Sequence, residues 1–480
     1  MGDLPRVENF NITGRMRFDF LAALVVYFIV LLAGSALSRK KQRGLEDFFL
    51  ASRKLSPLLV YFSVSASWIG AVSMLVSADE ALANGISSFW IMGLPAGVTV
   101  LIFAFVLARP IRRVNILSLP DLVEKWYGRE VRHITALLII WYMILLAASQ
   151  MVALGRFLQP ILGTSYIVSL GAGVGVVLLY SLRGGFSSVV ITDSIQFVLL
   201  GLGVIGLFVF ISERSSFVEV STLASQFELK NYFNFFSNIK ENVLIFISFT
   251  LAWTISPITW QRIQAARSEK AARSGLLGSA GTLLVFYMLV ISVGMMSLPL
   301  LSSRNLGEPL FSVLIRTDMN IFLGILLFVG ITAAVMSTMD TAINTGALSL
   351  TRDVFDRLFG LVSHGKSIRW SRLATLIVGI AAFLIATRFR SILQTLGLAS
   401  EIMAEGLFIP GIAMLFLRRK MPRAGLFSLV MGGGYSFLGF LAGISFLPWS
   451  WPSWPYSVPL GLGCGAAGFI IGAVIDLNQS

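Results

Sequence analysis

The chain has 480 residues, of which 56% are hydrophobic and 13% are charged, and its mean hydropathy is +0.83. This composition excludes a soluble globular protein, because apolar runs of about 20 residues recur along the whole length and each can cross a bilayer as a helix. The formal net charge of +13 first suggests a nucleic-acid surface. The Lys and Arg residues gather in alternate loops, however, so the charge reports membrane orientation and predicts no nucleic-acid partner.

Basic loops divide the chain into about thirteen predicted membrane helices, with the N-terminus outside and the C-terminus inside. The expected spans are Phe20–Leu37, Pro57–Leu82, Ser88–Leu107, Ile134–Leu158, Tyr166–Leu182, Phe186–Ile211, Asn242–Trp260, Leu276–Leu298, Ile321–Leu350, Leu373–Thr387, Ile392–Leu417, Leu426–Phe446 and Val458–Ile475. They group into an external N-terminus at 1–19, an extra helix at 20–37, a first five-helix set at 55–211, an external loop at 212–241, a second set at 242–417 and two C-terminal helices at 424–476.

Each five-helix set opens with a polar, interrupted helix. The first interruption is the serine-rich stretch Ser63–Ser73, and the second is Trp253–Pro257, where a proline removes a backbone hydrogen bond. Because five is odd, the second set crosses the membrane with the opposite orientation. Paired interruptions in two inverted halves are typical of a midplane binding site in secondary transporters. No residue-level repeat accompanies this symmetry, which depends on topology and break position alone.

A small solute needs a few polar groups on an apolar wall, and broken helices supply both. We therefore select the polar and aromatic residues near the breaks as substrate-binding candidates. They are Ser67, Trp68, Ser73, Gln150, Trp253, Ser256 and Pro257. The alternative for any single Trp is packing against lipid or a neighbouring helix.

Three oxygens converge in the ninth predicted span. Residues three and four apart share one helical face, so the hydroxyls of Ser337 and Thr338 lie near the carbonyl oxygen of Ala334. Such neutral oxygens suit a hard cation. The alternative is that these hydroxyls only bond their own backbone or a neighbouring helix, and helical spacing leaves both interpretations open.

Several charged residues fall in or near apolar spans. A carboxylate in a membrane helix is costly unless it is paired or wetted, so we expect Asp193 and Asp340 to take part in cation coupling. An ion pair or a contact with a serine-rich helix is the alternative. Glu401 and Glu405, four apart, either line the cytoplasmic half of the path or pair with basic loops. We place Arg262 at the inner surface, serving the inner gate or the positive-inside rule.

Residue types for catalysis are scarce. Cys464 is the single cysteine, which excludes an intrachain disulfide and a cysteine-based metal cluster. We find no histidine cluster for a metal and no Ser–His pair, so we predict no enzyme and no cofactor apart from a coupling ion.

Four segments together resemble the sodium:solute symporter family, which includes sodium–proline, sodium–glucose and sodium–pantothenate transporters. They are LEDFFLASRKLSP, GGFSSVVITDSIQ, PITWQRIQAARSEKAA and AAVMSTMDTAINTGALSLTRDVF, within a match from about Leu45 to Arg423. The resemblance implies an all-α, LeuT-type core of five plus five helices in inverted repeat. It also implies sodium-coupled symport of a small organic solute by alternating access.

The resemblance further implies particular ion ligands. A sodium site would use the backbone carbonyls of Ala66, Ile69 and Ala334 with the hydroxyls of Ser337 and Thr338. Asp193 matches the family's Thr-Asp-x-x-Gln aspartate, on the sodium path or at a second cation site. Asp340 stands where two-sodium members have a hydroxyl, so one or two sodium ions remain open.

Departures from the family pattern concern the solute. Trp68 stands where proline transporters have an aspartate, and the polar residues of sugar transporters are not evident at 91–98. We therefore predict a small organic solute of unspecified class as the partner, carried by a monomer in the lipid bilayer of the inner membrane.

Two alternatives remain open. One is a proton-coupled symporter of the same fold, using the aspartates and glutamates named above. The other is a non-transporting membrane sensor, which we disfavour because we expect no signalling domain after the last span.

Overall fold

The computed structural model describes residues 18–37, 50–70, 72–114, 116, 118–182, 186–301, 307–316, 319–360, 367–389, 391–417, 419–443 and 450–479. The predicted external N-terminus at 1–19 therefore lies outside the described residues, apart from its last two. Within the described residues the architecture is helical, and the one isolated β-bridge pairs Leu55 with Ala266.

The α-helices follow one another as α1 (Phe18–Leu37), α3 (Pro57–Trp68), α4 (Ser77–Asn84), α5 (Gly93–Ile102), α6 (Ala108–Arg113), α7 (Leu119–Tyr127), α8 (Arg129–Leu162), α9 (Tyr166–Ser181), α10 (Phe186–Ser212), α11 (Phe217–Gln226), α12 (Ile239–Thr254), α13 (Pro257–Ala265), α14 (Glu269–Met296), α15 (Leu310–Arg316), α16 (Ile321–Ser349), α17 (Ser367–Arg388), α18 (Ile392–Glu401), α19 (Phe408–Phe416), α20 (Pro422–Ser428), α21 (Gly434–Gly443) and α22 (Val458–Asn478). Five π-helical segments continue several of them, at Val72–Val76, Phe103–Leu107, Leu350–Asp356, Ile402–Leu407 and Leu429–Gly433.

Nine helices in the described ranges are long and apolar enough to cross a membrane, or ten if α12 and α13 count as one bent span. Three shorter apolar stretches, in α1, α3 and α9, add to these. A multi-pass membrane protein is thus the class that the structure supports. The count of thirteen spans and their orientation stay predictions.

Helix α16 forms the centre of the bundle, where it packs against α8, α10 and α17. From Ile331 to Ser349 every side chain of this helix except Asn344 is buried. A helix that is buried all round belongs to the interior, and small residues let its neighbours approach. At Gly330, for example, an added Cβ would lie 3.2 Å from the Cα of Leu200 in α10.

Both predicted interruptions are confirmed. Helix α3 begins with Pro57 after the N-cap Ser56 and ends at Trp68, where Ile69 leaves the helical conformation (φ −101°, ψ 77°). Helix α12 ends at Thr254, and α13 starts at Pro257 with its axis bent by 42° from that of α12. Proline at the first position of α13 costs no hydrogen bond there and blocks continuation from α12.

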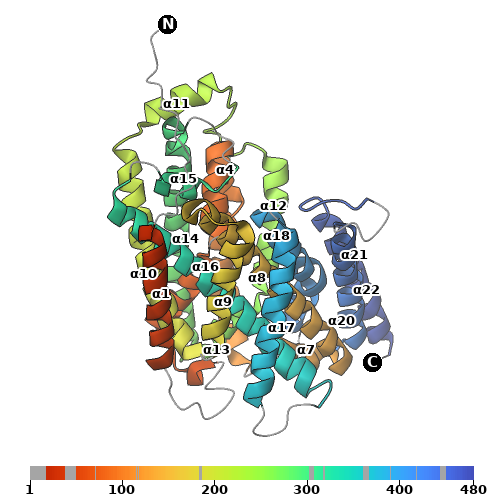
Figure 1. Cartoon of the computed structure of the whole chain (residues 1–480). Coiled ribbons are helices and arrows are strands. Elements are labelled where there is room, and N and C mark those ends of the chain that lie inside the picture. Colours follow the sequence, from red (N-terminus) through yellow and green to blue (C-terminus); the bar gives the residue numbers. More distant parts are fainter. Residues whose placement is uncertain are drawn as a thin grey trace.

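The periphery frames this core. Figure 1 shows α1 beside α10 at one edge of the bundle and α20, α21 and α22 together at the other edge. Helix α11 covers one end, while α7 and α13 lie at the opposite end (Figure 1). The two interrupted helices meet between these edges, where Trp68 of α3 contacts Trp253 of α12.

Candidate functional site

A central cavity lies where the two interrupted helices face α8 and α16. Its wall combines aromatic rings with hydroxyl and amide groups. The lining residues are Ser67, Trp68, Gly70, Ser73, Met92, Tyr142, Leu146, Gln150, Trp253, Ser256, Ile258, Thr259, Tyr287, Thr338 and Leu396. Six of the seven predicted substrate-binding residues are among them, since only Pro257 lies elsewhere.

The aromatic part of the wall is a chain of rings. Trp68 and Trp253 meet edge to face with ring centroids 5.2 Å apart, and Trp253 stacks on Phe249 at 4.8 Å. The indole nitrogen of Trp68 donates to the hydroxyl of Thr259 at 3.2 Å. Such a wall favours the apolar part of a solute, and nearby hydroxyls can orient its polar part.

The break in α3 lies directly against α16. A Cβ added to Gly70 would lie 2.8 Å from Oγ1 of Thr338 and 3.0 Å from Oε1 of Gln150, so only glycine allows this approach. Thr338 donates to the carbonyl of Ala334 at 3.2 Å, as the helical spacing predicts. The predicted sodium ligands on both helices, Ala66 and Ile69 included, are buried. Neutral carbonyl and hydroxyl oxygens from two facing helices are a donor set that a sodium ion accepts.

Ser337 is oriented by a second helix. Its hydroxyl donates to Oδ1 of Asp193 on α10. A hydroxyl that has given its one hydrogen to a carboxylate still has oxygen lone pairs for a cation. Asp193 therefore fixes the direction of one predicted sodium ligand and adds a negative charge beside it.

The burial of Arg262 differs from its predicted place at the inner surface. Its side chain is fully buried, and its Nη2 lies 3.6 Å from Oδ2 of Asp193. Its Nε donates to the hydroxyl of Ser63 at 2.9 Å, and Nη1 donates to the carbonyl of Ile258 at 3.1 Å. Through these contacts α13 is joined to α3 and α10, and through Ser337 also to α16.

Sequence reasoning missed this role because Arg262 directly precedes a basic loop and resembles an orientation signal. The signal that would have found it is Asp193 itself. A carboxylate deep in an apolar helix calls for a counter-charge, and Arg262 is the basic residue nearest to the second interruption.

Asp340 lies on the same helix as the predicted ligands Ala334, Ser337 and Thr338 but faces α9. Ser181 donates to its Oδ1, and the amide of Asn344 donates to the same oxygen at 2.6 Å. Thr341 next to it is buried, and its hydroxyl has no hydrogen-bond partner within the described ranges. The two predicted coupling aspartates are therefore held by different neighbours, Asp193 by an arginine and a serine, and Asp340 by a serine and an amide.

A second cavity lies beyond α13. Pro257 lines it together with Trp260, Gln261, Gln264 and residues of α7, α8 and α16. Ile258 and Thr259 of the same helix line the central cavity, so α13 separates the two spaces. Apolar side chains form most of the wall of the second cavity, and Pro257 lies there and not in the wall of the central cavity, where it was expected.

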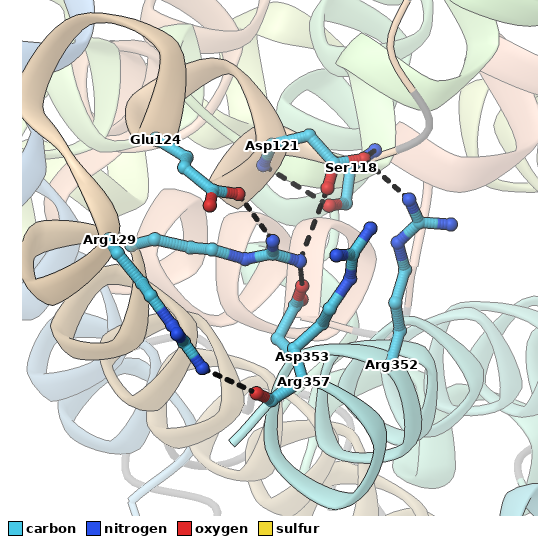
Figure 2. A network of polar contacts seen from close by, with 8 residues as sticks. Ser118, Asp121, Glu124, Arg129, Arg352, Asp353 and Arg357 are labelled. Carbon is cyan, nitrogen blue, oxygen red and sulfur yellow. Dashed lines mark hydrogen bonds and ion pairs between the residues drawn. The ribbon is translucent and has the colours of Figure 1, made fainter. Parts of the chain in front are cut away.

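Figure 2 shows a polar network near the second cavity that joins α7, α8 and the π-helical end of α16. Arg132 contacts Glu124 at 2.5 Å, Asp353 at 2.6 Å and Asp121 at 3.2 Å. Arg352 adds a contact to Asp121 at 3.0 Å. From the sequence, these basic residues were expected only to set the orientation of the chain in the membrane. In the structure, their ion pairs connect three elements.

Glu401 and Glu405 are both buried, and they lie outside the two cavities. Glu401 accepts a hydrogen bond from Ser457. Neither glutamate forms an ion pair with a Lys or Arg of the described chain, so the predicted pairing with basic loops is not seen there.

Comparison with known proteins gives a consistent result. Residues 48–433 match the family model described as the sodium:solute symporter family. The sodium/proline symporter of Escherichia coli is 24% identical over 479 residues, covering 95% of this chain and 91% of that protein. High-affinity choline transporter 1 of Drosophila melanogaster is 23% identical, covering 87% of this chain and 71% of that protein.

Solved structures agree at the level of the fold. A sodium-coupled sialic acid symporter in a substrate-bound, outward-open state superposes with a TM-score of 0.77 at 19% identity, covering 95% of this chain and 98% of that one. A nucleobase–cation symporter, in a closed form with bromovinylhydantoin bound, gives 0.55 at 15% identity and covers 90% and 95%. The chain thus has the fold of LeuT-type transporters.

Proposed function

We propose that this chain, which belongs to the sodium:solute symporter family, is a secondary active transporter that carries a small organic solute together with sodium by alternating access. Its relatives are symporters, so it is a transport protein and not an enzyme. We place it in the cell (inner) membrane as a monomer, with the N-terminus outside, the C-terminus inside and a five-plus-five inverted core.

The observation that carries this proposal is the contact of the α3 break with α16. Gly70 approaches both Thr338, a predicted sodium ligand, and Gln150, a lining residue of the central cavity. An ion bound by Ala66, Ile69, Ala334, Ser337 and Thr338 would hold α3 against α16 and so order the cavity wall. Since linkage is reciprocal, sodium and solute would then raise each other's affinity by the same factor.

Asp193 and Arg262 would act as the inner closure. Their contacts join α3, α10, α13 and α16 on the side of the central cavity that faces the second cavity. Sodium beside Asp193 competes with Arg262 for the same negative charge. We propose that this competition links occupancy of the ion site to the parting of α13 from its neighbours, through which solute leaves.

Asp193 and Asp340 are also our choice for a second cation site or a coupling role. Both are buried on or against α16, and Thr341 adds a buried hydroxyl with no hydrogen-bond partner in the described chain. We infer that Asp340, which faces α9, alters the affinity of the ion site for its cation. Proton coupling through the same aspartates is the alternative.

The solute is expected to have an apolar part and a polar part. Trp68 and Trp253 would contact the first, while Ser67, Ser73, Gln150 and Ser256 line the cavity with groups for the second. The relatives carry different solutes by name, namely proline, choline and sialic acid. With Trp68 in the wall, we do not transfer any of these to this chain.

The test compares thermal unfolding midpoints of the detergent-purified protein in sodium, potassium and choline salts at equal ionic strength. A bound ion stabilises by about 2.7 kcal/mol at a concentration one hundred times its Kd, whatever the solute. We expect a rise specific to sodium that the double variant Ser337→Ala, Thr338→Ala abolishes.

The matched control is Thr222→Ala with Ser225→Ala on the external helix α11. These two hydroxyls also bond backbone carbonyls four residues earlier, at 2.9 Å each, but lie away from α16. The control variant should keep the sodium response. Equal midpoints in all three salts, with a response to pH instead, would favour the proton-coupled alternative and refute the sodium site.

A further inference from the structure

A pair of carboxyl groups lies between α18 and the C-terminal helices, outside both cavities. Glu401 ends α18 and is 4% exposed, and Glu405 follows in the π-helical segment Ile402–Leu407 and is 1% exposed. Across from them, Ser457 precedes α22 and Gly461 lies one turn inside it. The two glutamates, four apart, therefore face Ser457 and Gly461, which are also four apart.

One side-chain hydrogen bond reaches the pair from the residues that the structure describes. The hydroxyl of Ser457 donates to Oε1 of Glu401. Both carboxyl oxygens of Glu405 are buried and have no hydrogen-bond partner in the described part of the chain. In the same part of the chain, no Lys, Arg or His nitrogen lies within 4.0 Å of either group.

The neighbouring helices approach Glu405 closely at glycine positions. A Cβ added to Gly461 would lie 2.1 Å from the carboxyl carbon of Glu405. At Gly432 and Gly465, an added Cβ would lie 1.9 Å and 2.5 Å from its main-chain oxygen. Gly461 thus packs directly against the carboxyl group, and Gly432 and Gly465 pack against the backbone of the same residue.

An ionised, unpartnered carboxylate in such a place is costly, and two of them side by side repel each other as well. A positive ligand must therefore neutralise at least one. A metal ion such as calcium needs several oxygen ligands, and among the described residues no group of three or more His, Cys, Asp or Glu side chains is placed to hold one. A proton needs only one oxygen.

Among the described residues, the other titratable groups near the pair offer no positive charge. They are Cys464 on α22 and Tyr435 on α21, both within electrostatic range of Glu405. Neither group is ever cationic. Neutralisation has to come from a bound proton.

We propose that Glu401 and Glu405 form a proton-binding site within the membrane domain, with the proton on Glu405 and the charge on Glu401, where Ser457 donates to it. The site goes beyond sodium coupling, because in the described structure Glu401 and Glu405 line neither of the two cavities and Glu401 is bound by Ser457, which is not a predicted sodium ligand. It binds hydrogen ions and not metal cations.

Side-chain contacts link the site to the wall of the central cavity. That this link affects transport rests on the proposed function. Trp454, three residues before Ser457, donates its indole hydrogen to Ser248 on α12 at 3.1 Å. Its ring lies 5.4 Å from that of Phe249, which stacks on Trp253 of the central cavity. Loss of the proton would shift Ser457 and, through this segment, the support of Trp253.

Infrared spectroscopy tests the proposal without any solute or sodium. A protonated carboxylic acid absorbs separately from carboxylates and amides, so the wild-type protein at neutral pH should show this band. The difference spectrum of Glu405→Gln against wild type should show its loss, while Glu213→Gln, whose side chain is 70% exposed, should leave it unchanged. Glu401→Gln should shift the band, because the charge next to the proton disappears.

Two results would overturn the proposal. One is the absence of a protonated-carboxyl band in the wild type, which needs no variant and so holds even if Glu405→Gln does not fold. The other is a band that neither glutamate variant alters. Since sodium plays no part in the spectra, failure here leaves the sodium site standing, and failure of the sodium response leaves this site standing.

Discussion

Asp193 and Glu405 are each 1% exposed within membrane helices, yet their surroundings are opposite. Asp193 has the guanidinium of Arg262 at 3.6 Å and the hydroxyl of Ser337 on its other oxygen. Glu405 has glycine backbone around it and no partner in the described chain. A buried carboxylate can be balanced by a counter-charge or by a proton, and this molecule uses both solutions.

The two solutions suit different tasks. An ion pair beside the predicted sodium ligands would respond to a metal cation, because sodium and Arg262 would compete for one charge. A buried carboxyl group that packs against Gly461 and has no partner in the described chain responds to pH. The contrast predicts that changes near Asp193 alter sodium dependence, whereas changes near Glu405 alter pH dependence.

The largest effect is expected for Arg262→Met. Removing one partner of a buried pair leaves Asp193 charged and uncompensated, and such changes cost about 3–5 kcal/mol. The free energy of unfolding in detergent should fall by that order. Adding Asp193→Asn should restore part of it, because the uncompensated charge is then gone. If the double variant is as unstable as the sum of the two single ones, the pair is not the reason for the burial of Arg262.

A smaller effect is expected for Gly432→Ala. Its Cβ would lie 1.9 Å from the main-chain oxygen of Glu405, and overpacking of this kind costs about 1–3 kcal/mol. Gly434→Ala is the matched control, since an added Cβ meets nothing within 4 Å there. Its unfolding midpoint should stay unchanged. Equal midpoints for both variants would contradict the close packing that encloses Glu405.

The smallest effect on stability is expected for Glu405→Gln below about pH 4, less than about 1 kcal/mol, because there an amide replaces an acid that is neutral in both the folded and the unfolded chain. The pH dependence should change more. The folded wild type keeps a proton that an unfolded Glu releases above about pH 4.3, so its stability falls with rising pH by about 1.4 kcal/mol per pH unit. Unfolding midpoints over a pH series should be flatter in the variant. A parallel series in both proteins would contradict protonation of Glu405.

Much of the architecture follows from local sequence. Apolar runs predict membrane helices because the bilayer leaves backbone groups no other partner. The interruptions at Ser63–Ser73 and Trp253–Pro257 are visible for the same reason, since small polar residues and a proline inside such runs weaken the helix. The contact of Thr338 with the Ala334 carbonyl also follows from spacing along one helix.

Contacts between helices could not be read in this way. Arg262 precedes a basic loop, and only the packing of α13 on α3 and α10 takes it out of water and brings it to Asp193. Pro257 belongs to the break, but the direction of α13 turns it toward the second cavity. Helical spacing places Ser337 and Thr338 on the same face of α16. The hydrogen bond that orients Ser337 comes from Asp193 and so depends on how α10 packs.

The sequence by itself determined that this is a helical membrane protein with two interrupted helices, a polar α16 and four carboxylates in apolar surroundings. Only the tertiary structure decided that Asp193 lies beside a counter-charge and that Glu405 packs against glycine. The physical reason is that burial and pairing are properties of facing surfaces. Residues far apart in the chain, such as Asp193 and Arg262 or Glu405 and Gly461, become neighbours only when the helices pack.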